Sequence, residues 1–225
     1  MTRAIALLGA ESTGKTELGA ALTAALSARG QRVALVPEVL RLWCEAEGRT
    51  PRPDEQQGIA TEQARRVESL LDGGGATPVD VVVADTTPLM TALYSELLFG
   101  DRSLYPFALA HQRRYHRTLL TGLDLPWVAD GLQRDGPHVR EPVDTMLRRV
   151  LGEAGIAFQM VYGIGEARLR HALDAIGPLP PTPGEVPPAG MPVRTETAGA
   201  WCCGTCGTCG DADCEHRLFT RLRGR

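Results

Sequence analysis

The stretch with the strongest chemical signal is GAESTGKT, which matches G-x-x-x-x-G-K-[ST] at every fixed position. In this pattern backbone N–H groups surround phosphate oxygens, a lysine contacts the outer phosphates of a nucleotide, and a hydroxyl holds magnesium. The pattern therefore predicts ATP and Mg²⁺ as ligands, with Lys15 on the phosphates and Thr16 on the metal. A chance match in a glycine-rich turn is the alternative. The predicted binding residues are Gly9, Ala10, Glu11, Ser12, Thr13, Gly14, Lys15 and Thr16.

Lys15 is also unusual within the composition of the chain. Of the 24 lysine and arginine residues, it is the only lysine. Arginine presents a broad planar fork, whereas lysine presents a compact ammonium group on a flexible stem. A single lysine in this position indicates a site that requires a small point charge.

Two acidic residues follow predicted strands and are candidates for binding magnesium or for accepting a proton from an acceptor. Asp85 ends the apolar run VDVVVAD, and Glu38 follows RVALV within LVPEVLR. A phosphate loop needs such acids at neighbouring strand ends. Either residue can instead cap the helix that follows it. We predict that Asp85 coordinates magnesium and that both acids are catalytic, and which of them is the base stays open.

Residues 126–140, PWVADGLQRDGPHVR, form a third candidate feature. This segment is rich in glycine and arginine and lies in the half of the domain where nucleotide kinases carry a lid. Arg134 and Arg140 are predicted to close over the transferring phosphoryl group and to neutralise its charge. An ordinary solvated loop is the alternative.

The C-terminal tail contains five of the six cysteines, in the segment WCCGTCGTCGDADCEH. Their spacing is typical of metal binding, and zinc requires four ligands. An iron–sulfur cluster is a second possibility, because the spacing approaches a cluster-binding pattern, and reducible thiols or disulfides are a third. The predicted zinc ligands are Cys203, Cys206, Cys209, Cys214 and His216.

The elements that must position these residues divide the 225-residue chain into three zones. Residues 1–176 alternate short apolar runs with amphipathic stretches, which predicts an α/β domain with a mainly parallel sheet. The expected strands span 4–8, 32–36, 79–85, 115–121 and 156–162. Residues 177–200 hold seven of the 16 prolines and are predicted to be a linker, followed by the Cys-rich tail at 201–225.

Taken together, GAESTGKT, VPEVLR, VVVADTTPLMTALY and PWVADGLQRDGPHVR resemble the NadR-type ribosylnicotinamide kinase domain, a branch of the nucleoside-kinase-like P-loop proteins. The resemblance covers roughly residues 3–176. It implies a P-loop NTPase fold with a five-stranded parallel sheet flanked by helices. It also implies ATP-dependent phosphorylation of nicotinamide riboside on its ribose hydroxyl, which gives nicotinamide mononucleotide for NAD salvage.

The sequence departs from this family at the expected substrate contacts. Pro37 and Arg65 occupy the places of the two aromatic rings that bracket nicotinamide, and Trp43, Tyr94 or Trp127 are candidate substitutes. The family's common D-T-D reads D-T-T from Asp85, which removes one carboxylate.

Composition limits the remaining function classes. The net charge is −3, which argues against a dedicated nucleic-acid binder, and no apolar run is long enough to suggest a membrane span. We expect a cytoplasmic enzyme that acts on a nucleoside-like small molecule, without a dedicated DNA-binding domain. The alternative is an ATP-dependent switch whose metal-binding tail contacts a protein or RNA partner.

Overall fold

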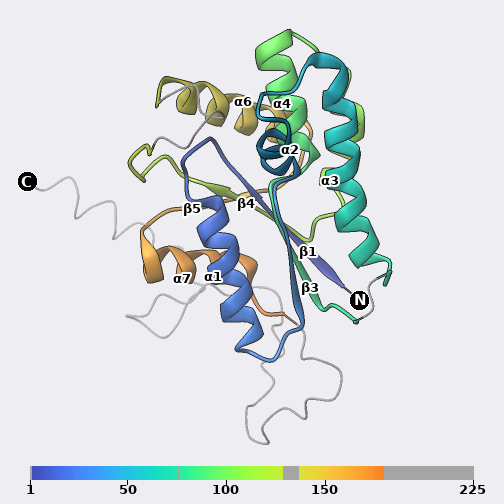
Figure 1. Ribbon diagram of the computed structural model, residues 1–225. Helices are drawn as coiled ribbons and strands as arrows, with labels where there is room; N and C mark the ends of the chain where they lie inside the picture. The colour runs from blue at the N-terminus through green and yellow to red at the C-terminus, as the bar shows by residue number, and fades with distance from the viewer. Residues whose placement is uncertain (1, 75–76, 129–136, 180–225) are drawn as a thin grey trace, which may run out of the picture. The chain divides into compact units, whose positions relative to one another are not determined.

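The computed structural model describes residues 2–74, 77–128 and 137–179, which form a parallel sheet with helices on both faces (Figure 1). The strands are β1 (Arg3–Leu8), β2 (Val33–Val36), β3 (Val81–Asp85), β4 (Arg117–Thr121) and β5 (Gln159–Val161). Their spatial order is β2-β3-β1-β4-β5, and each neighbouring pair is parallel. The predicted fold class and the five-stranded parallel sheet are confirmed.

Seven α-helices and two short 3₁₀ helices lie between or after these strands within the described residues. They are α1 (Lys15–Ser27), α2 (Val39–Glu47), η1 (Pro53–Glu55), α3 (Gln56–Leu71), α4 (Pro88–Phe99), α5 (Tyr105–Gln112), η3 (Pro137–Val139), α6 (Arg140–Glu153) and α7 (Gly165–Ile176). None of these helices is long and apolar enough to cross a membrane, in the part of the chain that the structure describes.

Alternation along β1 explains how the helices are distributed between the two faces. Ile5 and Leu7 pack in a core with α1 and α7, whereas Ala4, Ala6 and Leu8 face the cores built on α3, α4, α5 and α6. All five side chains are buried. A strand that is buried on both faces is a continuous apolar run, as the segment AIALL is after Arg3.

The four later strands are shorter than the apolar runs that predicted them. Before β3, the N–H of Asp80 donates to the carbonyl of Arg32, and the carboxylate of Asp80 also accepts hydrogen bonds from the backbone and the guanidinium of Arg32. Before β4, the N–H of Tyr115 bonds to the carbonyl of Gln112 and continues the turn that ends α5. β5 lies at the sheet edge and pairs with β4 over three residues.

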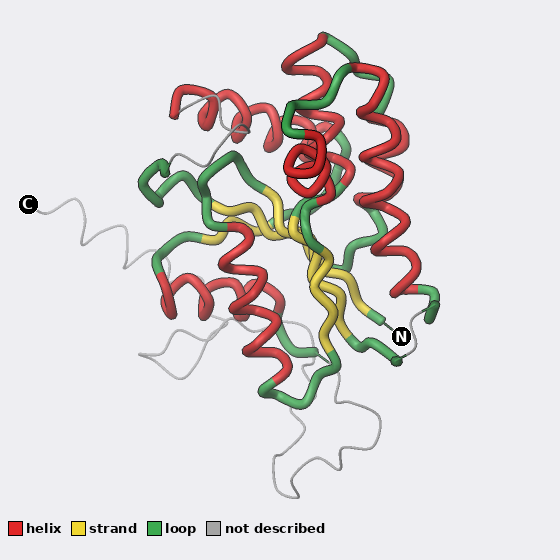
Figure 2. The backbone as a smooth tube through the Cα atoms, viewed as in Figure 1, coloured by secondary structure: helices red, strands yellow, loops and turns green. Residues whose placement is uncertain are grey.

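The carboxyl ends of the central strands meet at one edge of the sheet. Leu7 of β1 lies beside Asp85 of β3, and Val36 of β2 lies beside Ala84. Figure 2 shows the loops that lead from these strands into the helices. Ligands of open parallel sheets bind at these carboxyl ends, where the connection after β1 runs to β2 on one side and the connection after β3 runs to β4 on the other. The fold therefore brings the segments after β1, β2 and β3 together.

Candidate functional site

The segment between β1 and α1 adopts a backbone conformation that depends on its glycines. Gly9 has φ +147°, and a Cβ atom added there would lie 2.0 Å from Oγ1 of Thr121. Gly14, the N-cap of α1, has φ +71°, and Ser12 has φ +54°. Left-handed residues alternating with other conformations form the concave backbone arrangement that binds anions. This geometry fits the polyphosphate of ATP.

Lys15 lies over this loop. Its Nζ donates hydrogen bonds to the carbonyl oxygens of Gly9, at 3.0 Å, and Ala10, at 2.9 Å. The side chain is half-buried. The ammonium group is thus held at the loop by two neutral acceptors, from which it can turn to an anionic phosphate.

Asp85 is buried beside the start of α1. Its Oδ2 accepts a hydrogen bond from Oγ1 of Thr16 at 2.6 Å. Its Oδ1 is also buried and has no hydrogen-bond partner among the described residues. A buried carboxylate oxygen that accepts no hydrogen bond, next to a hydroxyl, provides oxygen ligands that suit Mg²⁺. The residue that follows, Thr86, has φ +69°, an uncommon backbone conformation for a non-glycine residue.

A cavity of about 610 Å³ opens in front of the loop. One wall is the phosphate loop itself, from Glu11 to Thr16, and the first turn of α1. The opposite walls come from α2, from the segment that leads into α3, and from the end of α4. The residues of those walls are Glu38, Leu40, Arg41, Cys44, Thr50, Pro51, Arg52, Pro53, Gln56, Tyr94, Leu98 and Phe99.

The two predicted acids occupy different positions relative to this cavity. Glu38 is the half-buried N-cap residue of α2 and lines the cavity together with Lys15. Asp85 is 3% exposed and is not among the lining residues in the described part of the chain. Although Glu38 occupies the N-cap position of α2, its side chain makes no capping hydrogen bond, so the alternative role of its carboxylate as a helix cap is not seen.

The aromatic residues differ in how they relate to the cavity. Tyr94, one of the three candidate substitutes for the nicotinamide bracket, lines the cavity. Phe99, which the sequence analysis missed, also lines the cavity. Trp43 instead packs against the guanidinium of Arg49, whose Cζ lies 4.8 Å from the centre of the Trp43 ring. Arg65 is exposed on α3 and pairs with Glu62. Pro37 is exposed as well.

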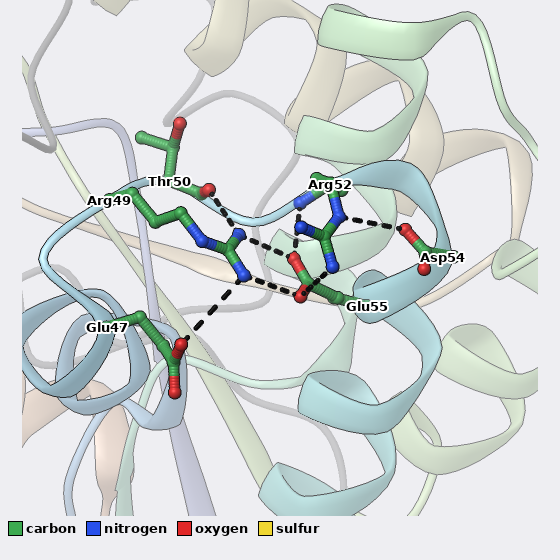
Figure 3. Close-up of polar contacts among 6 residues, drawn as sticks. All are labelled: Glu47, Arg49, Thr50, Arg52, Asp54 and Glu55. Carbon is green, nitrogen blue, oxygen red and sulfur yellow. Dashed lines mark hydrogen bonds and ion pairs between the residues drawn. The ribbon is translucent and has the colours of Figure 1, made fainter.

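The wall formed by residues 50–53 is fixed by a network of charged side chains (Figure 3). Glu55 accepts hydrogen bonds from both terminal nitrogens of Arg49, each at 2.7 Å, and from the backbone N–H and the guanidinium of Arg52. Hydrogen bonds from the Arg49 side chain and the Arg52 backbone lower the pKa of Glu55 to about 2. The carboxylate of Glu55 thus links both ends of the segment between α2 and α3.

The predicted lid is described only at its ends. Arg134 lies outside the described residues. Arg140 is the first residue of α6 and is 8% exposed, with Nε and Nη2 lacking hydrogen-bond partners among the described residues. Its guanidinium is therefore buried, and the role of both arginines in a lid stays a prediction.

The predicted metal site in the tail also lies outside the described residues, as does the linker beyond residue 179. This holds for Cys203, Cys206, Cys209, Cys214 and His216, so zinc binding there stays a prediction. Within the described residues, no group of three or more histidine, cysteine, aspartate or glutamate side chains is arranged to hold a metal ion. Cys44, the cysteine outside the tail, is buried with a free thiol.

A family model decides where this fold belongs. The model of the AAA_28 family, described as an AAA domain, matches residues 4–168, which include all five strands and end in the first turn of α7. The chain belongs to this AAA domain family. The match includes the phosphate loop, Glu38, Asp85 and Arg140.

Solved structures of NadR share the fold of this AAA domain. A crystal structure of NadR protein in complex with NAD and AMP-PNP matches with a TM-score of 0.61 at 18% identity, over 78% of this chain and 48% of NadR. NadR protein in complex with NR matches with a TM-score of 0.63 at 20% identity, over 78% and 50%. The chain spans about half the length of these NadR chains. No curated protein matches it in sequence.

Proposed function

We propose that this AAA domain transfers the γ-phosphoryl group of ATP to a hydroxyl of a nucleoside-like acceptor, and that nicotinamide riboside is the acceptor. One observation carries the proposal. The same cavity is lined on one side by the phosphate loop with Lys15 and on the other by Glu38 and Tyr94. A phosphoryl donor and an aromatic acceptor therefore fit within one space, which a nucleotide switch does not require. The NadR structures, with AMP-PNP in one and NR in another, support this choice of ligands.

In the proposed reaction, each side of the cavity has its own task. Lys15 contacts the outer phosphates, and Thr16 with Asp85 would hold Mg²⁺, which supplies charge neutralisation on the phosphate oxygens. The acceptor oxygen forms a bond to the γ-phosphorus as the bond from that phosphorus to the β–γ bridging oxygen breaks. ADP leaves, and the hydroxyl proton passes to the carboxylate of Glu38.

Two further predicted features are the lid arginines and the zinc site of the tail. Arg134 and Arg140 would stabilise the negative charge that develops on the transferring group. The zinc site of the tail is a separate proposal, and metal analysis of purified protein checks it. One zinc per chain in colourless protein is expected, whereas brown protein would indicate an iron–sulfur cluster.

The test of the function is a screen of nucleosides for ATP-dependent phosphorylation by the full chain, with products identified by mass. We expect nicotinamide mononucleotide from nicotinamide riboside. Phosphorylation of another nucleoside would keep the reaction and replace the substrate. ATP hydrolysis without any phosphorylated nucleoside would instead favour the switch.

A further inference from the structure

A buried arginine lies directly behind the phosphate loop. Arg168 of α7 is 4% exposed, and its Nη2 donates a 2.6 Å hydrogen bond to the carbonyl oxygen of Thr13. Its Nη1 donates to the carbonyl of Gly163 at 3.0 Å and lies 3.4 Å from Oδ1 of Asp124. One guanidinium thus joins the phosphate loop to the segments that follow β4 and β5.

The phosphate loop depends on contacts of this kind because its tip is buried and strained. Thr13 is fully buried, and its hydroxyl is already engaged with the carbonyl of Ala10 and the hydroxyl of Thr121. Its carbonyl would be left without a donor if Arg168 were absent, which is unfavourable for a buried polar group. The preceding residue, Ser12, holds φ +54°, a conformation that persists in a non-glycine residue only where the surroundings fix it.

The charge of Arg168 has a further effect on the same peptide bond. The carbonyl of Thr13 and the N–H of Gly14 belong to one peptide unit. A cationic donor on the carbonyl withdraws electron density and makes that N–H a stronger donor, because hydrogen bonds in a chain polarise one another. Gly14 is one of the loop residues whose N–H groups are expected to surround the phosphate oxygens.

Asp124 keeps the guanidinium in place from the other side. Its Oδ2 accepts a 2.6 Å hydrogen bond from the N–H of Gly163, whose carbonyl in turn accepts from Arg168. The segment that carries Asp124 also contacts the loop tip, since the N–H of Val128 donates to Oγ of Ser12 at 2.7 Å. The three segments therefore form one connected hydrogen-bond network around the tip of the loop.

We propose that Arg168 is a positioning residue that presets the phosphate loop for polyphosphate binding through the Thr13–Gly14 peptide, with Asp124 and Gly163 orienting its guanidinium. The inference rests on the proposed function only in that the loop binds the phosphates of ATP. Arg168 touches no substrate in this role. Its loss is expected to weaken the binding of the phosphates and to leave the contacts of the protein with the adenine base and with the acceptor unchanged.

The test is calorimetric titration of the full chain with MgATP, tripolyphosphate and adenosine. Arg168→Met keeps an unbranched apolar stem but removes the guanidinium with its donors and charge, and we expect at least a tenfold rise in the Kd of MgATP and of tripolyphosphate. The Kd of adenosine should not change. Arg168→Lys should fall between the wild type and Arg168→Met, because lysine keeps the charge but is shorter and lacks the planar fork whose two nitrogens contact the carbonyls of Thr13 and Gly163. The exposed Arg170, on the same helix, provides the control Arg170→Met, which should match the wild type.

Unchanged affinity of Arg168→Met for MgATP would overturn the proposal, as would an equal loss for adenosine and tripolyphosphate. If thermal unfolding shows that Arg168→Met does not fold, Asp124→Asn decides, with weaker MgATP binding expected and wild-type affinity contradicting the proposal. A wild-type chain that binds MgATP but phosphorylates no nucleoside would refute the kinase alone. A wild-type chain that binds no MgATP would refute both.

Discussion

The two sides of the cavity are built in different ways. The phosphate side is mostly backbone, shaped by Gly9 and Gly14 and held by hydrogen bonds with Thr121, Val128 and Arg168. The other side, where we propose that the acceptor binds and which we call the acceptor side, is mostly side chains, contributed by α2, the segment leading into α3, and α4. A backbone site recognises a group common to all nucleotides, whereas a wall of side chains can change its selectivity by substitution.

This difference separates two kinds of loss. Damage to the phosphate side should affect every substrate pair, because no phosphoryl group is bound correctly. Damage to the acceptor side should affect the acceptor and leave the binding of MgATP intact. The following substitutions test that separation, from the largest expected effect to the smallest.

Substitution of Lys15 is expected to have the largest effect. Loss of one charge contact in a phosphoryl-transfer site costs on the order of 3 kcal/mol in the barrier, roughly a hundredfold in rate. Lys15→Arg should fail almost as badly as Lys15→Ala, because a guanidinium is too broad for a loop whose carbonyls at Gly9 and Ala10 now bind a compact ammonium.

ATP turnover with the best acceptor measures this effect, and circular dichroism checks that both variants fold. Wild-type turnover by Lys15→Arg would show that the absence of other lysines is an accident of composition.

The two acids should separate the sides of the cavity. Asp85→Asn is expected to lower turnover by about 10²-fold or more and to raise the magnesium concentration needed for half-maximal rate. Glu38→Gln should lower kcat by a similar factor and leave the Kd of MgATP unchanged, because the proposed reaction places Glu38 beside the acceptor hydroxyl. Magnesium titrations and calorimetry distinguish the two patterns, and an exchange of patterns would assign the base to Asp85.

Tyr94 tests the acceptor wall alone. Stacking a base on an aromatic ring contributes roughly 1–3 kcal/mol, so Tyr94→Ala should raise the KM of the acceptor about tenfold or more. The KM of ATP should stay within about twofold, and Tyr94→Phe, which keeps the ring, should resemble the wild type. Equal increases in both KM values would show that the two sides are not independent.

Glu55 is expected to give the smallest effect, and one that depends on pH. Its pKa is about 2 in the folded chain against an ordinary value of 4.5, so its carboxylate stabilises the fold above about pH 4.5 and loses this contribution as the pH falls towards 2. The difference in melting temperature between wild type and Glu55→Gln should therefore shrink over that range. The KM of the acceptor should also rise, since Glu55 holds residues 50–53 in place.

Glu62→Gln is the matched control for this experiment. Glu62 also has a pKa lowered to about 2, by hydrogen bonds from Arg65 and Arg66 on the surface of α3. Its substitution should show the same pH dependence of stability without a change in the acceptor KM. An equal change in the acceptor KM of both variants would show that the network of Figure 3 has no specific effect on acceptor binding.

The sequence predicted the phosphate side more fully than the acceptor side, for a physical reason. The glycine pattern, the apolar strands and the acids that follow them are local features, so the placement of Thr16 beside Asp85 follows from the sheet order. The cavity wall at Phe99 and Arg41 has no local pattern, because it exists only when α2 and α4 are brought together. Arg168 lies 155 residues from the carbonyl that it binds, and no spacing indicates that contact.

The presence of one lysine has a consequence for chemistry carried out on the protein. Reagents that acylate primary amines find a single side-chain target in all 225 residues, and that target is Lys15. The amine is half-buried between two carbonyl oxygens at the loop. Apart from the α-amino group, a covalent label would therefore report on this one position, and a single increment in mass would record whether the loop is open or occupied.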